Sequence, residues 1–301
     1  MRTLNFFPLL LIFLSANYGC AANPATGQQD LVLMSEQKEI ALGRKTHQQV
    51  LQQYIVYDDP ELQTYVQKTG ERLASNSHRN NLVYRFTVLD SKDVNAFALP
   101  GGYIYITRGL MAYLNSEAEL AAVLGHEIGH VTARHSVRQY STTQLANIGA
   151  TLAAILIPGM NAVGNQLVQL FGTALLSGYG REHELEADRL GAEYLARTDY
   201  DPQAMLRVIR VLKNQELFET QLAKAEGREP RIYHGLFSTH PDNDTRLQGV
   251  IAHAGKFQKT QSSYTGREGF MEKIDGMVFG DNTREGILRG LKFYHPDLGF
   301  A

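Results

Sequence analysis

The stretch AAVLGHEIGHVTARH, residues 121–135, constrains this chain more than any other. His126 and His130 stand four positions apart, and on an α-helix such positions share one face, so both imidazoles can reach one metal ion. Glu127 lies one step round the helix, where it can reach a water molecule on that ion. Ser116 and Glu119 have the spacing of a capping box, which predicts where the helix begins. The alternative is a helix that carries two surface histidines.

The two histidines fall between two other features of this predicted helix. An apolar stripe is formed by Leu120, Val123, Leu124 and Val131. The neighbouring face is made of small residues: Ala122, Gly125, Gly129 and Ala133. Because the histidines lie at the edge of the stripe, we expect a half-buried site at the wall of a cleft. The small residues allow another backbone to approach the helix closely.

A catalytic zinc site needs a third protein ligand besides the two histidines. The chain has one cysteine, so a cysteine cluster cannot provide the site. One class of zinc sites with this motif takes a third histidine six residues after the second, behind a glycine. That class is excluded here, because Ser136 stands at the histidine position and Ala133 at the glycine position. The later segment GYGREHELEADRLGAEYLA supplies Glu184 and Asp188, again four apart on one face. We assign Glu184 to the metal and Asp188 to a hydrogen bond with a ligating histidine.

Other polar residues near these motifs are weaker candidates. Glu182, His183 and Glu186 compete for the ligand role, but facing geometry favours a solvated charged face for them. His135 is five residues after His130 and points to a different face of the helix. We therefore expect structural hydrogen bonds from His135.

The N-terminus is typical of an export signal. Arg2 supplies a positive charge, and residues 6–14 form an apolar run well short of the roughly 20 residues that a membrane-spanning helix needs. Cys20 stands where a bacterial lipoprotein is cut and lipidated, which predicts a signal peptide over 1–19, a tether over 20–34 and a lipid anchor. The alternatives are cleavage after Ala22, which gives a soluble protein, and a buried N-terminal helix.

The rest of the chain predicts an α+β fold that is mainly helical, with a small β-sheet. Helical periodicity covers 35–54, 59–77 and most of the chain after Ser116, whereas 82–90 alternates like a strand and 95–110 like a strand, a turn and a second strand. The nearly uncharged segment 145–178 predicts a buried or lid-like helical hairpin, with a membrane-dipping segment as the alternative. The formal net charge of -2 argues against nucleic acid as a partner.

Three motifs in this order, NAFALPGGY, HEIGH and ELEAD, resemble one known family. The chain is similar, over about residues 35–255, to the gluzincin metallopeptidases of peptidase family M48. These include the HtpX heat-shock proteases, the Oma-type mitochondrial proteases, the CAAX prenyl endopeptidases and periplasmic BepA-type proteins. The resemblance implies a zincin-type fold, one Zn²⁺ per chain held by His126, His130 and Glu184, and Glu127 as the catalytic base.

The resemblance also implies a substrate-binding strand edge beside the cleft. An extended polypeptide would add to this edge by backbone pairing. The edge residues are Asn95, Ala96, Phe97, Gly101, Gly102 and Tyr103. The segment STHPDNDTR matches a later histidine motif of the family, which implies that His240 stabilises the transition state or gates the metal, with Arg246 as its charged neighbour.

These features predict a zinc-dependent endopeptidase domain over 35–258 and a C-terminal tail over 259–301. The tail has no assigned chemistry, one short helix expected near 270–277, and a structural His295. We expect the substrates to be misfolded or unassembled cell-envelope proteins, and the location to be the periplasm, anchored to the outer membrane rather than the inner one. The alternative is a chaperone-like peptide-binding or assembly factor with a mostly gated site. A zinc hydrolase of non-peptide substrates is the third hypothesis.

Overall fold

The structure is a computed structural model, and it describes residues 20–144, 179–228, 263–280, 287–289 and 292–294. Four predictions fall outside the described residues: the signal peptide over 1–19, the hairpin over 145–178, the roles of His240 and Arg246, and the structural role of His295. In the described part of the chain, no helix is long and apolar enough to cross a membrane.

A three-stranded mixed sheet forms the middle of the fold, in the order β3-β5-β4. β3 (Arg85–Leu89) runs parallel to β5 (Tyr103–Thr107), and β4 (Ala96–Leu99) runs antiparallel to it. Gly101 and Gly102 have φ of +77° and +93°, which glycine adopts without strain, so the chain reverses tightly between β4 and β5. The predicted alternation in the first strand and the predicted strand-turn-strand are both confirmed.

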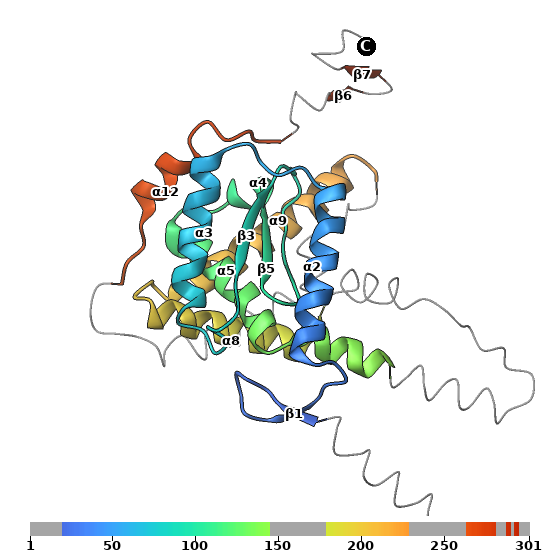
Figure 1. Cartoon of the computed structure of the whole chain (residues 1–301). Coiled ribbons are helices and arrows are strands. Elements are labelled where there is room, and N and C mark those ends of the chain that lie inside the picture. Colours follow the sequence, from blue (N-terminus) through green and yellow to red (C-terminus); the bar gives the residue numbers. More distant parts are fainter. Residues whose placement is uncertain (1–19, 145–178, 229–262, 281–286, 290–291, 295–301) are drawn as a thin grey trace, which may run out of the picture.

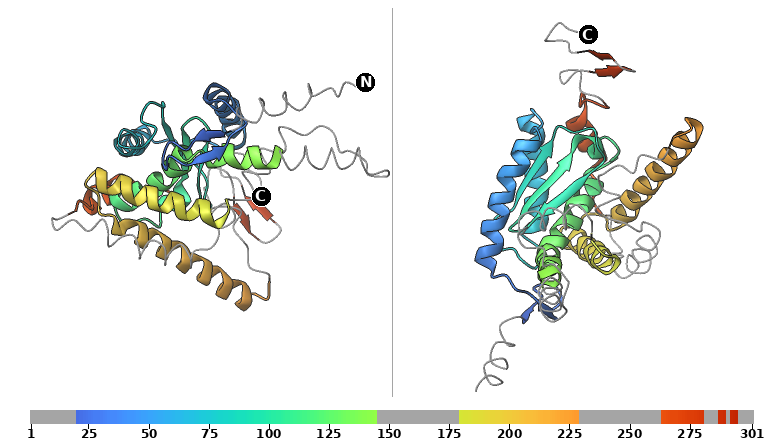
Figure 2. Two further views of the ribbon diagram at one scale, coloured as in Figure 1. Left: turned by 90° about the horizontal axis from the view of Figure 1, so that it is seen from below. Right: turned by 90° about the vertical axis from the view of Figure 1, so that its right-hand side faces the viewer.

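Helices cover both faces of this sheet (Figures 1 and 2). α2 (Glu36–Gln53) lies on one face, where Val50 packs against Leu99, Tyr103 and Tyr105. α3 (Pro60–Ala74) and α5 (Glu117–Thr132) lie on the other face and share the main core with the alternate residues of the strands. α3 begins as predicted, with Asp59 accepting from the backbone of Leu62 and proline at the first helical position. The short α4 (Arg108–Met111) follows β5.

α5 packs most extensively on α8 (Arg181–Arg197), and α9 (Gln203–Ala225) packs against both. Every residue of α5 from Ala118 to Thr132 is buried. The expectation of a half-buried site is therefore wrong, because His126 and His130 are 4% and 1% exposed. The reason is that the sheet, α3, α8 and α9 contact α5 from several sides, so its small residues are covered as fully as its apolar stripe.

The N-terminal segment expected to be a tether folds against the helices. β1 (Cys20–Ala22) pairs antiparallel with β2 (Gln29–Leu31), and we call residues 20–31 the N-terminal hairpin. Asp30 forms an ion pair with Arg138 (3.3 Å). The hydroxyl of Ser141 accepts a hydrogen bond from the backbone of Leu33 (2.9 Å). Both contacts join this segment to the helical residues 135–144 that follow α5.

Part of the predicted C-terminal tail packs on the core. The helix expected near 270–277 is present three residues earlier, as α12 (Arg267–Ile274), and its Phe270 is fully buried against α3 and α5. Further on, the buried Arg108 donates to the carbonyls of Val278 and Gly280 (2.9 and 2.8 Å). A hairpin of β6 (Ile287–Arg289) and β7 (Lys292–Tyr294) completes the described residues.

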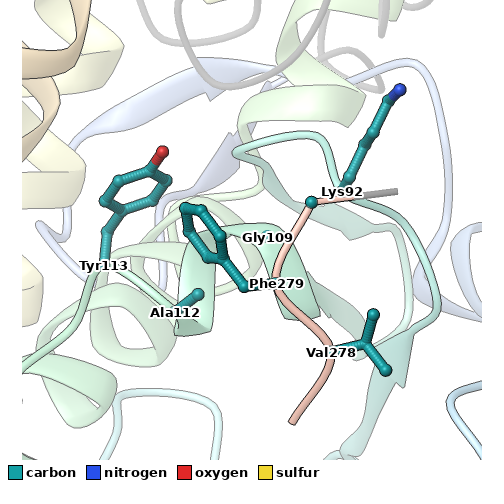
Figure 3. Close-up of a pocket in the computed structure, with 7 residues that line it drawn as sticks. Lys92, Gly109, Ala112, Tyr113, Val278 and Phe279 are labelled. Carbon is teal, nitrogen blue, oxygen red and sulfur yellow. The ribbon is translucent and has the colours of Figure 1, made fainter. Parts of the chain in front are cut away.

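A small cavity of about 200 Å³ lies where this C-terminal segment crosses α4 (Figure 3). Lys92, Gly109, Tyr113, Val278 and Phe279 are among the residues that line it. The ring of Phe279 meets Tyr113 edge to face, with centroids 5.9 Å apart. The cavity has no acidic residue or histidine in its lining, so metal chemistry belongs elsewhere in the described residues.

Candidate metal centre

α5 presents the two histidines as predicted. Its first turn is capped by Ser116, whose hydroxyl accepts from the backbone of Glu119 (3.3 Å), while the Glu119 carboxylate accepts from the backbone of Asn115 (2.8 Å). One turn apart on this helix, the Nε2 atoms of His126 and His130 lie 2.9 Å from each other. Glu127 directly follows His126 in the sequence, and this residue is buried, with 1% exposure.

Glu184, on α8, completes a set of three donors. Its carboxylate oxygens lie 3.5 Å from the Nε2 atom of His126 and 3.4 Å from that of His130. In the described residues this is the one group of three or more histidine, cysteine or acidic side chains close enough to hold a metal ion. The side chain of Glu184 is fully buried, so the structure brings together the three ligands that the sequence predicted.

The hydrogen bonds around the histidines fit a metal in the space between these donors. Asp188 Oδ1 lies 2.8 Å from His126 Nδ1, as predicted, and an ionised carboxylate only accepts hydrogen bonds. The proton of a neutral His126 therefore sits on Nδ1, and its Nε2 lone pair faces Glu184. Two imidazole nitrogens and a carboxylate oxygen, all electron-pair donors, converge in a buried space. Such a set is stable when it shares a cation, and two histidines with one glutamate form one of the ligand sets found in catalytic zinc sites.

The backbone of α8 approaches α5 closely enough to bring Glu184 to the histidines. The Cα atoms of Gly129 and Gly191 carry no side chain at the crossing, where the backbone of each helix lies against the other. At Gly191, an added Cβ would lie 2.9 Å from the backbone nitrogen of His126. The sequence predicted close packing here from its small residues, and the structure shows that it occurs between the two ligand-bearing helices.

A group of aromatic and charged residues surrounds His130 and was not predicted as part of the site. Tyr179 stacks on the His130 ring, with centroids 4.1 Å apart, and its hydroxyl lies 2.6 Å from that of Ser136. Burial raises the pKa of Tyr179, so its hydroxyl stays protonated. On the other side, His135 Nδ1 lies 2.8 Å from His130 Nδ1. The expected structural hydrogen bonds of His135 thus include one to a predicted ligand.

A break in the helix places His135 beside His130. α5 ends at Thr132, and Arg134 has a φ of +54°, a left-handed conformation that side chains rarely adopt. The guanidinium of Arg134 donates to Glu39 (2.8 Å) and to the backbone oxygen of Met34 (3.0 Å), which holds this turn. The prediction that His135 points to a different face assumed a continuous helix, and the turn redirects the side chain toward His130.

Two of the three competing residues on α8 also take part in this group. Glu182 is exposed, as expected for a solvated face, but Glu186 accepts from His135 Nε2 (3.1 Å) and from Arg138 (2.9 Å). Although burial raises the pKa of Glu186, these hydrogen bonds and charges outweigh it and lower the pKa to about 2. His183 stacks on His135 at 4.3 Å. Burial first, and then the charges of His135 and Arg138, lower the pKa of His183 to about 4.

The strand expected to border the site, β4, is an edge strand in the described residues. Thr107 donates its backbone N–H to the carbonyl of Asn95 (3.0 Å), in register with the β4–β5 pairing. Backbone groups alternate in direction along a strand, so those of Phe97 also face β5, whereas those of Ala96 and Ala98 face the free side. α5, which carries the histidines, packs against β4.

The other predicted edge residues do not lie on that free side. Gly101 and Gly102 form the turn, and Tyr103 belongs to β5, which has a strand on each side. A backbone already paired on both sides has no hydrogen bonds left for a substrate. The side chain of Phe97 stacks on Tyr105 with centroids 4.8 Å apart. The edge available to an extended peptide is therefore shorter than the predicted 95–103 segment and ends with β4 at Leu99.

Comparisons with known proteins agree with this site. The sequence model of peptidase family M48 matches residues 60–253, which include α5 and α8. The chain is 28% identical over 242 residues to the beta-barrel assembly-enhancing protease of Yersinia pestis, which is 78% of this chain and 48% of that protein. It is 32% identical over 200 residues to the protein of the same name in Escherichia coli K12, covering 63% of this chain and 38% of the relative. It is also 32% identical over 225 residues to the mitochondrial metalloendopeptidase OMA1 of Arabidopsis thaliana, covering 72% and 42%. The chain thus spans less than half the length of each of these relatives.

Proposed function

Since the chain belongs to peptidase family M48, we propose that it is a zinc-dependent endopeptidase that hydrolyses peptide bonds in extended polypeptides. The observation that carries this proposal is the buried set of His126, His130 and Glu184, with Glu127 on the same helical turn as the histidines. A protein that only bound peptides would need neither the three donors nor the adjacent carboxylate.

Different residues of this chain have different roles in the proposed reaction. His126, His130 and Glu184 hold the zinc, and zinc, when bound, supplies Lewis acidity that polarises a peptide carbonyl and activates water near neutral pH. Glu127 acts as the general base that takes a proton from the attacking water and later delivers it to the leaving amine. Asp188 keeps the proton of His126 on Nδ1, so that its Nε2 faces the metal.

The free side of β4 orients the substrate in this proposal. An extended peptide would pair with the outward backbone groups of Ala96 and Ala98, and backbone pairing accepts many side-chain sequences. His240 or Arg246, as carried over from the family motif, would stabilise the negative charge that develops on the carbonyl oxygen. We place the substrates among misfolded or unassembled cell-envelope proteins, which is supported by relatives that are named for enhancing β-barrel assembly.

The test compares the full chain with Glu127→Gln and Glu184→Ala, using casein cleavage and zinc content. Glu127→Gln should keep one equivalent of zinc and lose on the order of 10²-fold or more in turnover, because the ligands remain and the base is gone. Glu184→Ala should lose the zinc as well. Glu182→Gln is the matched control, since Glu182 is an exposed carboxylate on the same helix.

Two outcomes would overturn this proposal. Cleavage by Glu127→Gln at the wild-type rate would remove Glu127 from the mechanism. A wild-type protein that binds zinc, cleaves nothing and suppresses aggregation of unfolded clients as well as Glu127→Gln does would identify a chaperone-like binding protein.

We also propose that Cys20 carries a lipid that holds the protein on the periplasmic side of the outer membrane. The support is the apolar run over 6–14 and the position of the single cysteine after it. Cys20→Ser, expressed in a bacterial host and fractionated, should leave the membrane fraction. If the variant stays with the outer membrane as fully as the wild type, the anchor is not at Cys20.

A further inference from the structure

The two histidine ligands differ in the group that holds their second nitrogen. His126 Nδ1 lies beside the carboxylate of Asp188, whereas His130 Nδ1 lies 2.8 Å from another imidazole nitrogen, Nδ1 of His135. The His130 and His135 rings meet edge to face, with centroids 4.8 Å apart and planes at 73°. His135 is fully buried. His135 thus contacts a predicted metal ligand through one ring nitrogen and Glu186 through the other, so it is part of the site.

The positions of the protons on this chain of groups follow from Glu186. Its carboxylate only accepts hydrogen bonds, so His135 Nε2, 3.1 Å away, must carry a proton and donate it. If His130 offers its Nε2 lone pair to the proposed metal, its own proton is on Nδ1. In the short contact between the two Nδ1 atoms, His130 therefore donates and His135 accepts. The hydrogen bonds therefore run from His130 to His135 and from His135 to Glu186, which accepts.

Glu186 is in turn held from two directions. Arg138 donates to the same oxygen as His135 does, at 2.9 Å. Asn23, in the N-terminal hairpin, donates to the other oxygen at 3.4 Å. Arg138 also pairs with Asp30 of that hairpin. The carboxylate of Glu186, on α8, is thus fixed by contacts from the helix after α5 and from the N-terminal hairpin.

We propose that His135 and Glu186 are positioning residues of the metal centre: they hold His130 in the tautomer and ring orientation in which Nε2 binds the metal. This inference rests on the proposed metal site. Partners of this kind fix the ring and increase its basicity, and their removal weakens metal affinity by roughly 10- to 100-fold. Neither residue belongs to the set of three metal donors. Their effect reaches the metal only through the hydrogen bond from His130.

The test measures the zinc dissociation constant of the full chain by chelator competition, for His135→Asn and His135→Leu. Asparagine and leucine have similar size, but the asparagine oxygen can accept the proton of His130 and leucine cannot. His135→Leu should weaken zinc binding by roughly 10- to 100-fold, and His135→Asn should retain most of the affinity. The visible spectrum of the cobalt-substituted protein should shift in the leucine variant.

A role in packing alone predicts the opposite order. Leucine fills an apolar space at less cost than an amide, so it would then be tolerated as well as asparagine or better. Thr132→Val is the matched control, because Thr132 is a buried hydrogen-bonding residue two positions from His130 that contacts Tyr194 and not a ligand. Its zinc affinity should equal that of the wild type, although the protein loses stability.

A second pair of variants keeps the test informative if the His135 variants fail to fold. Glu186 is at the rim of the site, with its side chain 16% exposed, so Glu186→Ala should fold and weaken zinc binding several-fold. Glu182→Ala, at an exposed position one turn away, should fold and leave zinc binding unchanged. Unchanged zinc affinity in both His135→Leu and Glu186→Ala would overturn the inference. A wild-type protein that binds no zinc would instead overturn the proposed function.

Discussion

A substitution at Gly129 tests whether the close crossing of α5 and α8 is what brings the metal donors together. A Cβ added there would lie 2.9 Å from the backbone oxygen of Ala187 and 3.0 Å from its Cα, too close for atoms of a rigid helix backbone. Four residues earlier on the same helix, a Cβ added at Gly125 would meet nothing nearer than Gly191 at 3.4 Å, an ordinary contact. Gly129→Ala and Gly125→Ala therefore make the same chemical change with and without a clash.

The free energies can be compared because the two positions share one helix. Either substitution gains up to about 1 kcal/mol from the higher helix propensity of alanine. Overpacking at Gly129 costs about 1–3 kcal/mol, because α8 must move away. Gly125→Ala should be more stable than the wild type by up to about 1 kcal/mol. Gly129→Ala should be about 1–3 kcal/mol less stable than Gly125→Ala.

The displacement should also reach the metal. Ala187 is three residues after Glu184 on α8, so a shift of that helix moves the Glu184 carboxylate away from His126 and His130. A metal site tolerates shifts of only about 0.5 Å. Zinc binding should therefore weaken in Gly129→Ala and stay unchanged in Gly125→Ala.

Urea unfolding of the chelator-treated proteins gives the stability difference, and chelator competition gives the zinc affinity. Far-UV circular dichroism of both variants controls for gross misfolding. If Gly129→Ala proves as stable as Gly125→Ala and binds zinc equally well, the reasoning that close backbone contact sets the ligand distances is refuted.

Two further predictions concern parts of the fold away from the metal. Phe270→Ala should destabilise the protein by about 3 kcal/mol in urea unfolding, because this fully buried residue joins the C-terminal segment to the core. Phe279→Ala, at a residue that is 70% exposed, should change stability by less than about 0.5 kcal/mol. Equal effects of the two substitutions would show that α12 does not pack as described. Burial, and then the charge of Arg85, lower the pKa of His47 below 6.5. The folded state therefore binds fewer protons than the unfolded state near this pH. The stability that depends on neutral His47 is present above pH 6.5 and is lost as the pH falls. The loss of stability between pH 7.5 and 5.5 should be smaller in His47→Gln, and an identical loss would contradict the assignment.

Much of the fold and site could be predicted from local patterns. The i, i+4 spacing of His126 and His130 fixes their relation wherever the stretch is helical, because helix geometry is the same in every context. The alternation in 82–90 and the two glycines after Pro100 likewise depend on local backbone preference. Glu184 and Asp188 could be assigned by the same spacing, although they are more than fifty residues away.

Long-range packing decided what local patterns could not. The burial of α5 from Ala118 to Thr132 was not predictable, since it depends on how many elements contact one helix and not on its own periodicity. The usable substrate edge was overestimated because hydrogen bonds from β5 determine which backbone groups of β4 face outward. The same is true of the N-terminal hairpin, whose polar sequence resembled a linker until its contacts with Arg138 and Glu186 were known.

The sequence by itself determined which chemical groups are available and which of them share a helical face: two imidazoles with a carboxylate between them, and a later carboxylate pair. Only the tertiary structure decided how far apart those faces lie and what supports them. The distance depends on glycine-mediated contact between two helix backbones, and the support of His130 depends on a left-handed turn at Arg134 that no periodicity encodes. The helix contact and the turn both depend on the free energy of packing the whole chain, and the sequence of a short segment does not determine that free energy.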